Sequence, residues 1–434
     1  MDEWNPGDKA SISEENWTRD LFLHKLMHGL QTSDFDWSDF SAEQTDRTIK
    51  ELDKRLGTSI HPKEDYKVPR AATRKWTFKK GKAQTLGYTS EEYEVVTEDG
   101  YILTLFRIRG NKDPVLLVHG FLDSSDTYII RGNRSLVANL AQNDYDVWSA
   151  NVRGGRYSRR HLRLNPDGDA MFWDFSYHEI GYYDLPAIID FILDRTGKDQ
   201  LSAIGHSQGN TIFYVLGSTR PVYNKKVRVM IALSPICYFN NVKPPSSTVL
   251  KSVPLISNVL LKTGEEEVFG DKTVLRLALR YFCGCKECYN ICARGVFFPI
   301  GGNDPDEIEP DFFPTIIEHY PTGSSRKNTV HLAQGYLNSF SQFDYGSKNN
   351  EVYGQSYPPK YDLRKVSMRI VLLAGRNDGL ASLKDVETLR DRLPNVVEYK
   401  VLDYKLMNHI DFVWGRNMDK YLFPYIINAL NRSY

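Results

Sequence analysis

A short apolar run leads directly into a serine flanked by glycines, and this junction constrains the fold more than any other stretch of the chain. Residues 201–204 are apolar enough for a strand buried in a sheet. Residues 205–209, Gly-His-Ser-Gln-Gly, fit the pattern G-x-S-x-G, a sharp turn from strand to helix that lifts the serine above the end of the sheet. By chance, the pattern occurs in roughly one of every six or seven chains of this length. It predicts chemistry only if the partners of a nucleophilic serine follow downstream.

Apolar runs and helical periodicity alternate on both sides of this junction. Strands are predicted at residues 93–96 and 101–108, which form a hairpin, and at 115–118, 146–152, 201–204, 227–233, 369–374 and 397–402. Helices are predicted at residues 184–195, 211–217, 383–392 and 418–430. This alternation predicts an α/β fold with a mostly parallel central sheet and helices on both faces.

Composition shifts divide the chain into four segments. Residues 1–82 are a polar N-terminal extension with helices expected at 15–30 and 41–57 and a basic linker at 70–82. Residues 83–235 form the first part of the α/β core, and residues 366–434 form the second part. Residues 236–365 interrupt the alternation and are too long for a loop, so we expect an inserted cap or lid.

Two partners of the serine follow it in the chain. A serine hydroxyl needs a histidine to take its proton and a carboxylate to orient that histidine. In the α/β-hydrolase fold these partners come in the order Ser, Asp, His, on loops after late strands. Asp378 follows the strand predicted at 369–374, and His409 follows the last strand. We therefore predict a catalytic triad of Ser207, Asp378 and His409.

Other residues of the same types are weaker candidates. Asp403 and Asp411 are the rival carboxylates, and Asp411 stands only two positions from His409, so its side chain would have to fold back. His119 and His206 are expected to serve packing and orientation.

A tetrahedral intermediate also requires two donors for its negative oxygen. One should be the backbone N–H of Gln208, directly after the serine. The other should come from the loop at 119–122, with Leu122 preferred and Phe121 as the alternative. This chemistry requires no cofactor and no metal.

Four of the five cysteines cluster in the expected cap, at positions 283, 285, 288 and 292. Their number suggests zinc, but the spacing C-x-C-x2-C-x3-C is not a usual pattern for four zinc ligands. At least one disulfide is the better interpretation if the chain is secreted. Cys237 makes the count odd, so at least one thiol should remain free.

Charge and hydropathy exclude some functional classes. The 434 residues carry a formal net charge of zero, which gives no electrostatic reason to expect nucleic-acid binding. No apolar run approaches the roughly 18 residues of a membrane span. Glycosylation sequons begin at Asn16, Asn133 and Asn431 and weakly favour secretion. Nothing in the sequence indicates the oligomeric state.

From residue 86 onward the chain resembles the acid lipases, the group that contains gastric lipase and lysosomal acid lipase. The resemblance rests on motifs in family order at residues 87–95, 119–122, 151–154, 205–209 and 408–414. It implies the same triad, Leu122 and Gln208 as oxyanion donors, and a cap over the site. It also implies a cap disulfide between cysteines nine positions apart, which Cys283 and Cys292 match; the cysteines at 285 and 288 are additions to the family pattern.

The expected function is therefore hydrolysis of lipid esters, triacylglycerols or sterol esters, at an emulsion or membrane surface. The alternatives are a small-ester carboxylesterase and a lipid-binding carrier that keeps the fold without turnover. By resemblance the chain is secreted or lysosomal. Its first residues lack the basic start and apolar core of a signal peptide, so a cytoplasmic location is the alternative.

Overall fold

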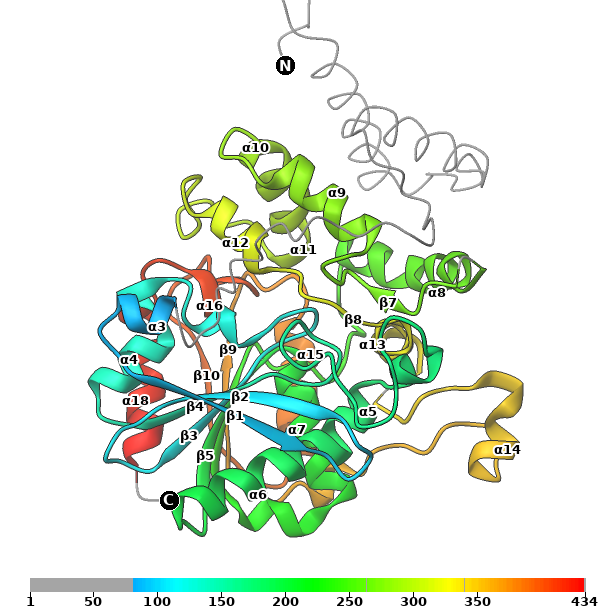
Figure 1. Cartoon of the computed structure of the whole chain (residues 1–434), viewed down its shortest axis with the longest axis horizontal. Helices are drawn as coiled ribbons and strands as arrows, with labels where there is room; N and C mark the ends of the chain where they lie inside the picture. Colours follow the sequence, from blue (N-terminus) through cyan, green and yellow to red (C-terminus); the bar gives the residue numbers. More distant parts are fainter. Residues whose placement is uncertain (1–80, 263, 339, 433–434) are drawn as a thin grey trace, which may run out of the picture. The chain divides into compact units, whose positions relative to one another are not determined.

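A computed structural model describes residues 81–262, 264–338 and 340–432 (Figure 1). The helices predicted at 15–30 and 41–57, and all but the end of the basic linker, lie outside the described residues. A short helix, α3 (Lys82–Thr85), precedes the first strand. The described residues form one compact unit.

An eight-stranded sheet forms the centre of this unit, in the order β1-β2-β4-β3-β5-β6-β9-β10. The strands are β1 (Ser90–Val96), β2 (Ile102–Ile108), β3 (Pro114–Val118), β4 (Asp146–Ala150), β5 (Leu201–His206), β6 (Val227–Leu233), β9 (Ile370–Ala374) and β10 (Val396–Val401). The first three strands in this order pair antiparallel, and every later pairing is parallel. The predicted fold class is confirmed.

Helices cover both faces of the sheet because its central strands are apolar on both sides. Every residue of β3 is buried, and its neighbours along the strand point to opposite faces. Leu116 and Val118 pack with α6, α7 and α15, whereas Val115 and Leu117 pack with α4 and α18. These helices are α4 (Leu136–Gln142), α6 (Leu185–Thr196), α7 (Gln208–Thr219), α15 (Leu383–Arg392) and α18 (Phe423–Asn431), and the shorter α5 (Tyr177–Glu179) precedes α6.

Between β6 and β9 the chain leaves the sheet for the cap segment (residues 236–365). It contains α8 (Ser246–Lys262), α9 (Val274–Cys283), α10 (Tyr289–Cys292), α11 (Phe298–Gly301), α12 (Phe313–His319), α13 (Arg326–Asn338) and α14 (Asn349–Tyr353). Two short strands, β7 (Glu267–Val268) and β8 (Ser324–Ser325), pair with each other. Figure 1 shows α9 to α12 gathered at one end of the described unit, near α16 (Asp411–Trp414).

The prediction of one closing helix at 418–430 is wrong. The structure has two helices there, α17 (Met418–Tyr421) and α18, with a break at Leu422. Pro424 lies in the first turn of α18, and a proline lacks the N–H that a continuous helix would need and clashes with the preceding turn. The helix therefore restarts instead of continuing.

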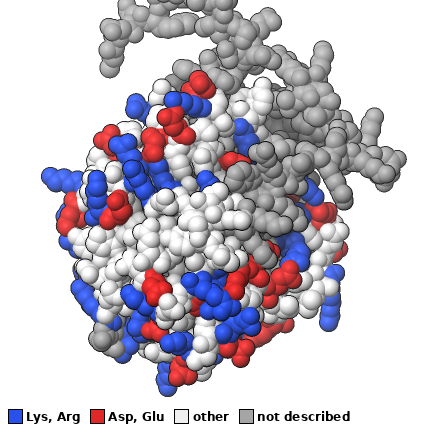
Figure 2. All heavy atoms as spheres, turned by 60° about the vertical axis from the view of Figure 1, so that its left-hand side comes forward, with Lys and Arg blue, Asp and Glu red and all other residues white. Residues whose placement is uncertain are grey.

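Charged side chains of both signs are interspersed over the face shown in Figure 2. Ion pairs at the surface include Arg160 with Glu94 and Lys198 with Asp113, at 2.5 and 3.0 Å. Blue and red atoms both occur over the part of this face that is not drawn in grey, in agreement with the zero net charge of the chain.

Gly209 shows how tightly α7 approaches the sheet. A Cβ atom added there would lie 2.3 Å from the carbonyl oxygen of Val118 and 2.9 Å from that of His119. Because both neighbours are backbone atoms, we expect Gly209→Ala to destabilise the protein by about 2–3 kcal/mol. Thermal unfolding should show a lower Tm, whereas Gly168→Ala, at an exposed loop glycine, should leave the Tm unchanged. Equal Tm values for both variants would contradict this account of the close approach.

Candidate active site

Ser207 occupies the sharp turn between β5 and α7. Its backbone has φ 54° and ψ −121°, a conformation that costs a non-glycine residue strain energy. The sheet holds it there, because the Ser207 N–H donates to the carbonyl oxygen of Leu233 on the neighbouring strand β6, at 3.1 Å. The hydroxyl therefore lies at the carboxyl edge of the parallel strands, where the loops after β6, β9 and β10 also begin.

Two of those loops bring the predicted partners to the serine. His409, after β10, has its Nε2 atom 2.9 Å from the hydroxyl oxygen of Ser207. Its Nδ1 atom lies 3.1 and 3.2 Å from the two carboxylate oxygens of Asp378, which follows β9. Ser207, His409 and Asp378 thus form a continuous hydrogen-bonded row although they are far apart in sequence.

The carboxylate of Asp378 is fully buried, yet its pKa is lowered. Burial alone would raise its pKa, but the charge of His409 and the hydrogen bonds that the carboxylate accepts outweigh burial, so the pKa lies below its usual value. Two of these donors are the backbone N–H groups of Leu380 and Ala381, at 2.9 and 2.7 Å from Oδ1. Asp378 can therefore remain negative in acidic solution.

Neither rival carboxylate makes a hydrogen bond to the His409 ring among the described residues. Asp403 accepts hydrogen bonds from Lys400 and Tyr425 at the surface, at 2.8 and 2.6 Å. Asp411 is buried beneath the loop and accepts the Asn408 N–H at 3.0 Å. Burial raises the pKa of Asp411, with a further contribution from Asp304.

The two other histidines near the serine stay neutral. Burial lowers the pKa of His206 to about 3 and that of His119 to about 4. His206 holds the carbonyl oxygen of His409 through its Nε2 atom at 2.9 Å, and His119 bonds to the Gly120 carbonyl oxygen at 2.8 Å. Both therefore fix backbone around the site.

The loop after β3 passes directly over the serine. A Cβ atom on Gly120 would lie 3.2 Å from Ser207 Cβ, and Leu122 has a positive φ of 58°. The cap segment anchors this loop, because the Thr322 N–H donates to the Leu122 carbonyl oxygen at 2.7 Å. Gln208 begins α7, where N–H groups lack an acceptor within the helix.

A cavity of about 280 Å³, lined mainly by apolar side chains, lies next to the serine. Ser207 and His409 lie on its wall. The cap segment contributes Leu279, Phe297, Ile300 and Tyr320, and the core contributes Phe121 and Trp414. This arrangement suits a long apolar group attached to a small polar reacting centre.

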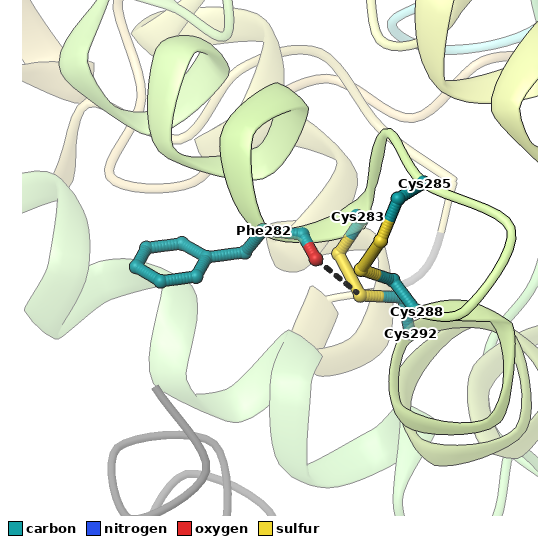
Figure 3. The surroundings of a disulfide bond; sticks show 5 residues. All are labelled: Phe282, Cys283, Cys285, Cys288 and Cys292. Atoms are coloured by element: carbon teal, nitrogen blue, oxygen red, sulfur yellow. Dashed lines mark hydrogen bonds between the residues drawn. A yellow bond between two sulfur atoms is a disulfide. The ribbon is translucent and has the colours of Figure 1, made fainter. Parts of the chain in front are cut away.

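Two disulfides lie at the junction of α9 and α10, where Figure 3 shows them side by side. Cys283 pairs with Cys292, and Cys285 pairs with Cys288, with Cα atoms 5.7 and 5.2 Å apart. All four sulfurs are thus in disulfides, and none is a thiolate ligand for zinc. Cys237 is a free, buried thiol.

One residue at the site was missed by sequence reasoning. The hydroxyl oxygen of Ser234 lies 2.6 Å from Asp378 Oδ2 and 2.6 Å from His409 Nδ1. A signal for it exists in the sequence, because Ser234 directly follows the predicted strand 227–233 and so falls at the same edge as the serine turn.

Comparisons with known proteins show the family of the chain. Residues 113–281 match the family model of the alpha/beta hydrolase fold, and residues 82–132 match that of a partial alpha/beta-hydrolase lipase region. Lipase 1 of Drosophila melanogaster is 40% identical over 351 residues, which span 80% of this chain and 78% of that protein. Human gastric triacylglycerol lipase is 34% identical over 366 residues, which span 80% and 89%. The solved esterase of Exiguobacterium antarcticum aligns with a TM-score of 0.49 and 12% identity, covering 79% of this chain and all of that one.

Asp123, next to Leu122, should make the stability of the protein depend on pH. Burial, with a contribution from Asp126, raises its pKa to about 7 in the folded protein. The folded state then holds a proton that the unfolded chain releases near pH 4, so stability falls as the pH rises from about 4 to 7. We expect Asp123→Asn to raise the Tm over wild type by a few degrees more at pH 7.5 than at pH 4.5.

The exposed Asp419→Asn is the matched control for this measurement. Its difference in Tm from wild type should be the same at both pH values. A pH-independent difference for Asp123→Asn as well would contradict the buried, protonated state of Asp123.

Proposed function

Because the chain belongs to the lipase family of the α/β-hydrolase fold, we propose that it cleaves carboxylic esters of lipids through an acyl-enzyme on Ser207. The observation that carries the proposal is the hydrogen-bonded row from Ser207 through His409 to Asp378, at the wall of an apolar cavity. A serine in such a row is activated by the histidine beside it.

Each group has one task in the proposed mechanism. The hydroxyl oxygen of Ser207 attacks the ester carbonyl carbon as His409 Nε2 takes its proton, and Asp378 orients the imidazole and stabilises its positive charge. The N–H groups of Gln208 and Leu122 bind the negative oxygen of the tetrahedral intermediate. His409 then protonates the departing alcohol, and a water molecule releases the fatty acid by the same steps.

The cavity supports a lipid substrate, because an acyl chain can replace water along its apolar wall. The cap segment provides much of that wall, through residues such as Leu279 and Ile300. Triacylglycerols and sterol esters, presented at an emulsion or membrane surface, are the proposed substrates. In the described part of the chain, no helix is long and apolar enough to span a bilayer.

Release of fatty acid from a triolein emulsion and from a cholesteryl ester, between pH 4 and 8, tests this function. We expect wild type to release fatty acid and Ser207→Ala to lose at least about 10³-fold in rate. Ser149→Ala, which changes another fully buried serine, in β4, should keep the wild-type rate. Activity confined to soluble short-chain esters would favour a carboxylesterase. No hydrolysis of any ester and no labelling of Ser207 by an organophosphonate would overturn the proposal.

The disulfides bear on the compartment, because such bonds persist in oxidising surroundings. We propose that the protein passes through the secretory pathway to the cell exterior or to lysosomes. Asn133 is an exposed sequon position, whereas the side chain of Asn431 accepts a hydrogen bond from Tyr145 at 2.7 Å.

We expect an N-linked glycan on Asn133 when the full chain is expressed in animal cells. Asn133→Gln should lose one glycan-sized step in gel mobility, and the exposed Asn165→Gln, outside any sequon, should lose none. Mobility unchanged by Asn133→Gln and by glycosidase treatment would favour the cytoplasmic alternative.

A further inference from the structure

Ser234 is placed by the sheet between the proposed nucleophile and the proposed acid. Strand β6 pairs with β5 on one side and β9 on the other, and Leu233 is in register with His206 and with Leu373. The next residue along β6 is therefore level with Ser207. Its N–H donates to the carbonyl oxygen of Leu373 at 3.0 Å, which extends the ladder by one residue into the site.

The hydroxyl of Ser234 makes the shortest contacts of the Asp378–His409 pair. Its oxygen is 2.6 Å from His409 Nδ1, whereas the nearest carboxylate oxygen is 3.1 Å from that nitrogen. The same oxygen is 2.6 Å from Asp378 Oδ2. Ser234 is completely buried, so no solvent competes for these contacts.

The direction of each hydrogen bond follows from the chemistry of the neighbours. His409 Nε2 must be unprotonated to accept the Ser207 proton, so the neutral ring carries its hydrogen on Nδ1. An ionised Asp378 can only accept. The Ser234 oxygen therefore accepts the Nδ1–H, and its own hydrogen is donated to Asp378 Oδ2.

We propose that Ser234 is a positioning residue that links the imidazole of His409 to the carboxylate of Asp378. This proposal rests on the proposed function, since it concerns the same row of groups. When His409 becomes positive in the transition state, its Nδ1–H has both an uncharged hydroxyl and a carboxylate as acceptors. The ring is thereby fixed in the orientation and tautomer that Ser207 requires.

The backbone of Ser234 is held in place, and this fixes the position of its hydroxyl group. The residue has a positive φ of 50°, which costs strain for a side chain of this kind. Its carbonyl oxygen accepts the side-chain amide of Asn210 on α7, at 3.3 Å.

Kinetics on a soluble aryl ester test the role without interference from an emulsion surface. We expect Ser234→Ala to lower kcat about tenfold, the effect of one hydrogen bond to a charged group, and to leave KM within about twofold. KM should not change because the residue lies behind the imidazole and away from substrate. Ser149→Ala should change neither constant. Wild-type kcat in Ser234→Ala would overturn the proposal.

Ser234→Gly is a second variant that separates loss of the hydroxyl group from loss of stability. Glycine adopts a positive φ without strain, so this variant should fold normally. Its Tm should be at least that of Ser234→Ala, and its kcat should fall by the same factor. A low Tm in Ser234→Ala combined with normal kcat in Ser234→Gly would assign the serine to packing and overturn the proposal.

A double-mutant cycle tests whether Ser234 acts through its hydrogen bond to Asp378 or independently of it. In a background of Asp378→Asn the link from Ser234 has already lost its charged end, so adding Ser234→Ala should lower kcat by less than about threefold. Multiplication of the two single effects would show that Ser234 acts independently of Asp378 and would contradict the link.

Proton NMR of the resting protein gives a readout that needs no turnover. The resonance of the His409 Nδ1 proton should shift in Ser234→Ala and Ser234→Gly and stay in place in Ser149→Ala. An unchanged resonance in the Ser234 variants would overturn the link even if the wild type is active. An inactive wild type that shows the shift would instead contradict the proposed function and retain the link.

Discussion

The alignment of parallel strands at their carboxyl ends is the constraint on which the site depends. Hydrogen bonds from Ser207 to Leu233 and from Ser234 to Leu373 continue the ladder of β5, β6 and β9 beyond the strands themselves. Since these strands are packed against helices on both faces, a slip of register would disrupt that close packing and is strongly opposed. The relative heights of the three loops are therefore set by the core of the sheet, before any side chain of the site makes a contact.

The same rigidity lets the protein keep strained backbone where the chemistry needs it. Leu122, Ser207 and Ser234 all have positive φ values, of 58°, 54° and 50°. Each such conformation costs on the order of 1–3 kcal/mol and persists only when its surroundings determine it. Ser207 and Ser234 directly follow buried strands, and each donates a backbone hydrogen bond to a neighbouring strand. Leu122 lies in the loop after β3, and its carbonyl oxygen accepts the N–H of Thr322 in the cap segment. Burial of the sheet offsets the cost of this strain. The hydroxyl groups of Ser207 and Ser234 both reach the ring of His409 from these strained positions.

The fold could be predicted from sequence because a strand buried on both faces leaves a continuous apolar run, as at 115–118 and 227–233. Ser207, Asp378 and His409 could be singled out because each follows such a run in an informative order. Ser234 also follows such a run, but its contacts with both Asp378 and His409 depend on the register between strands, which spacing along one chain does not encode. The break at Leu422 was missed because helical periodicity continues through it, and the local effect of Pro424 prevailed over that pattern. The helices expected within 1–82 lie outside the described residues.

Buried acidic groups of the protein differ in the direction in which their surroundings shift the pKa. Burial raises the pKa of Asp123 to about 7 and that of Asp184 to about 6, despite the Arg153 guanidinium beside the latter. Both bind protons more tightly when folded, so below neutral pH they favour the folded state. Asp378 is equally buried but has a lowered pKa, because it accepts hydrogen bonds from Ser234 and from backbone and faces His409. Lowering the pH through about 7 and 6 therefore protonates Asp123 and Asp184 in favour of the folded state, whereas the lowered pKa of Asp378 keeps that carboxylate ionised.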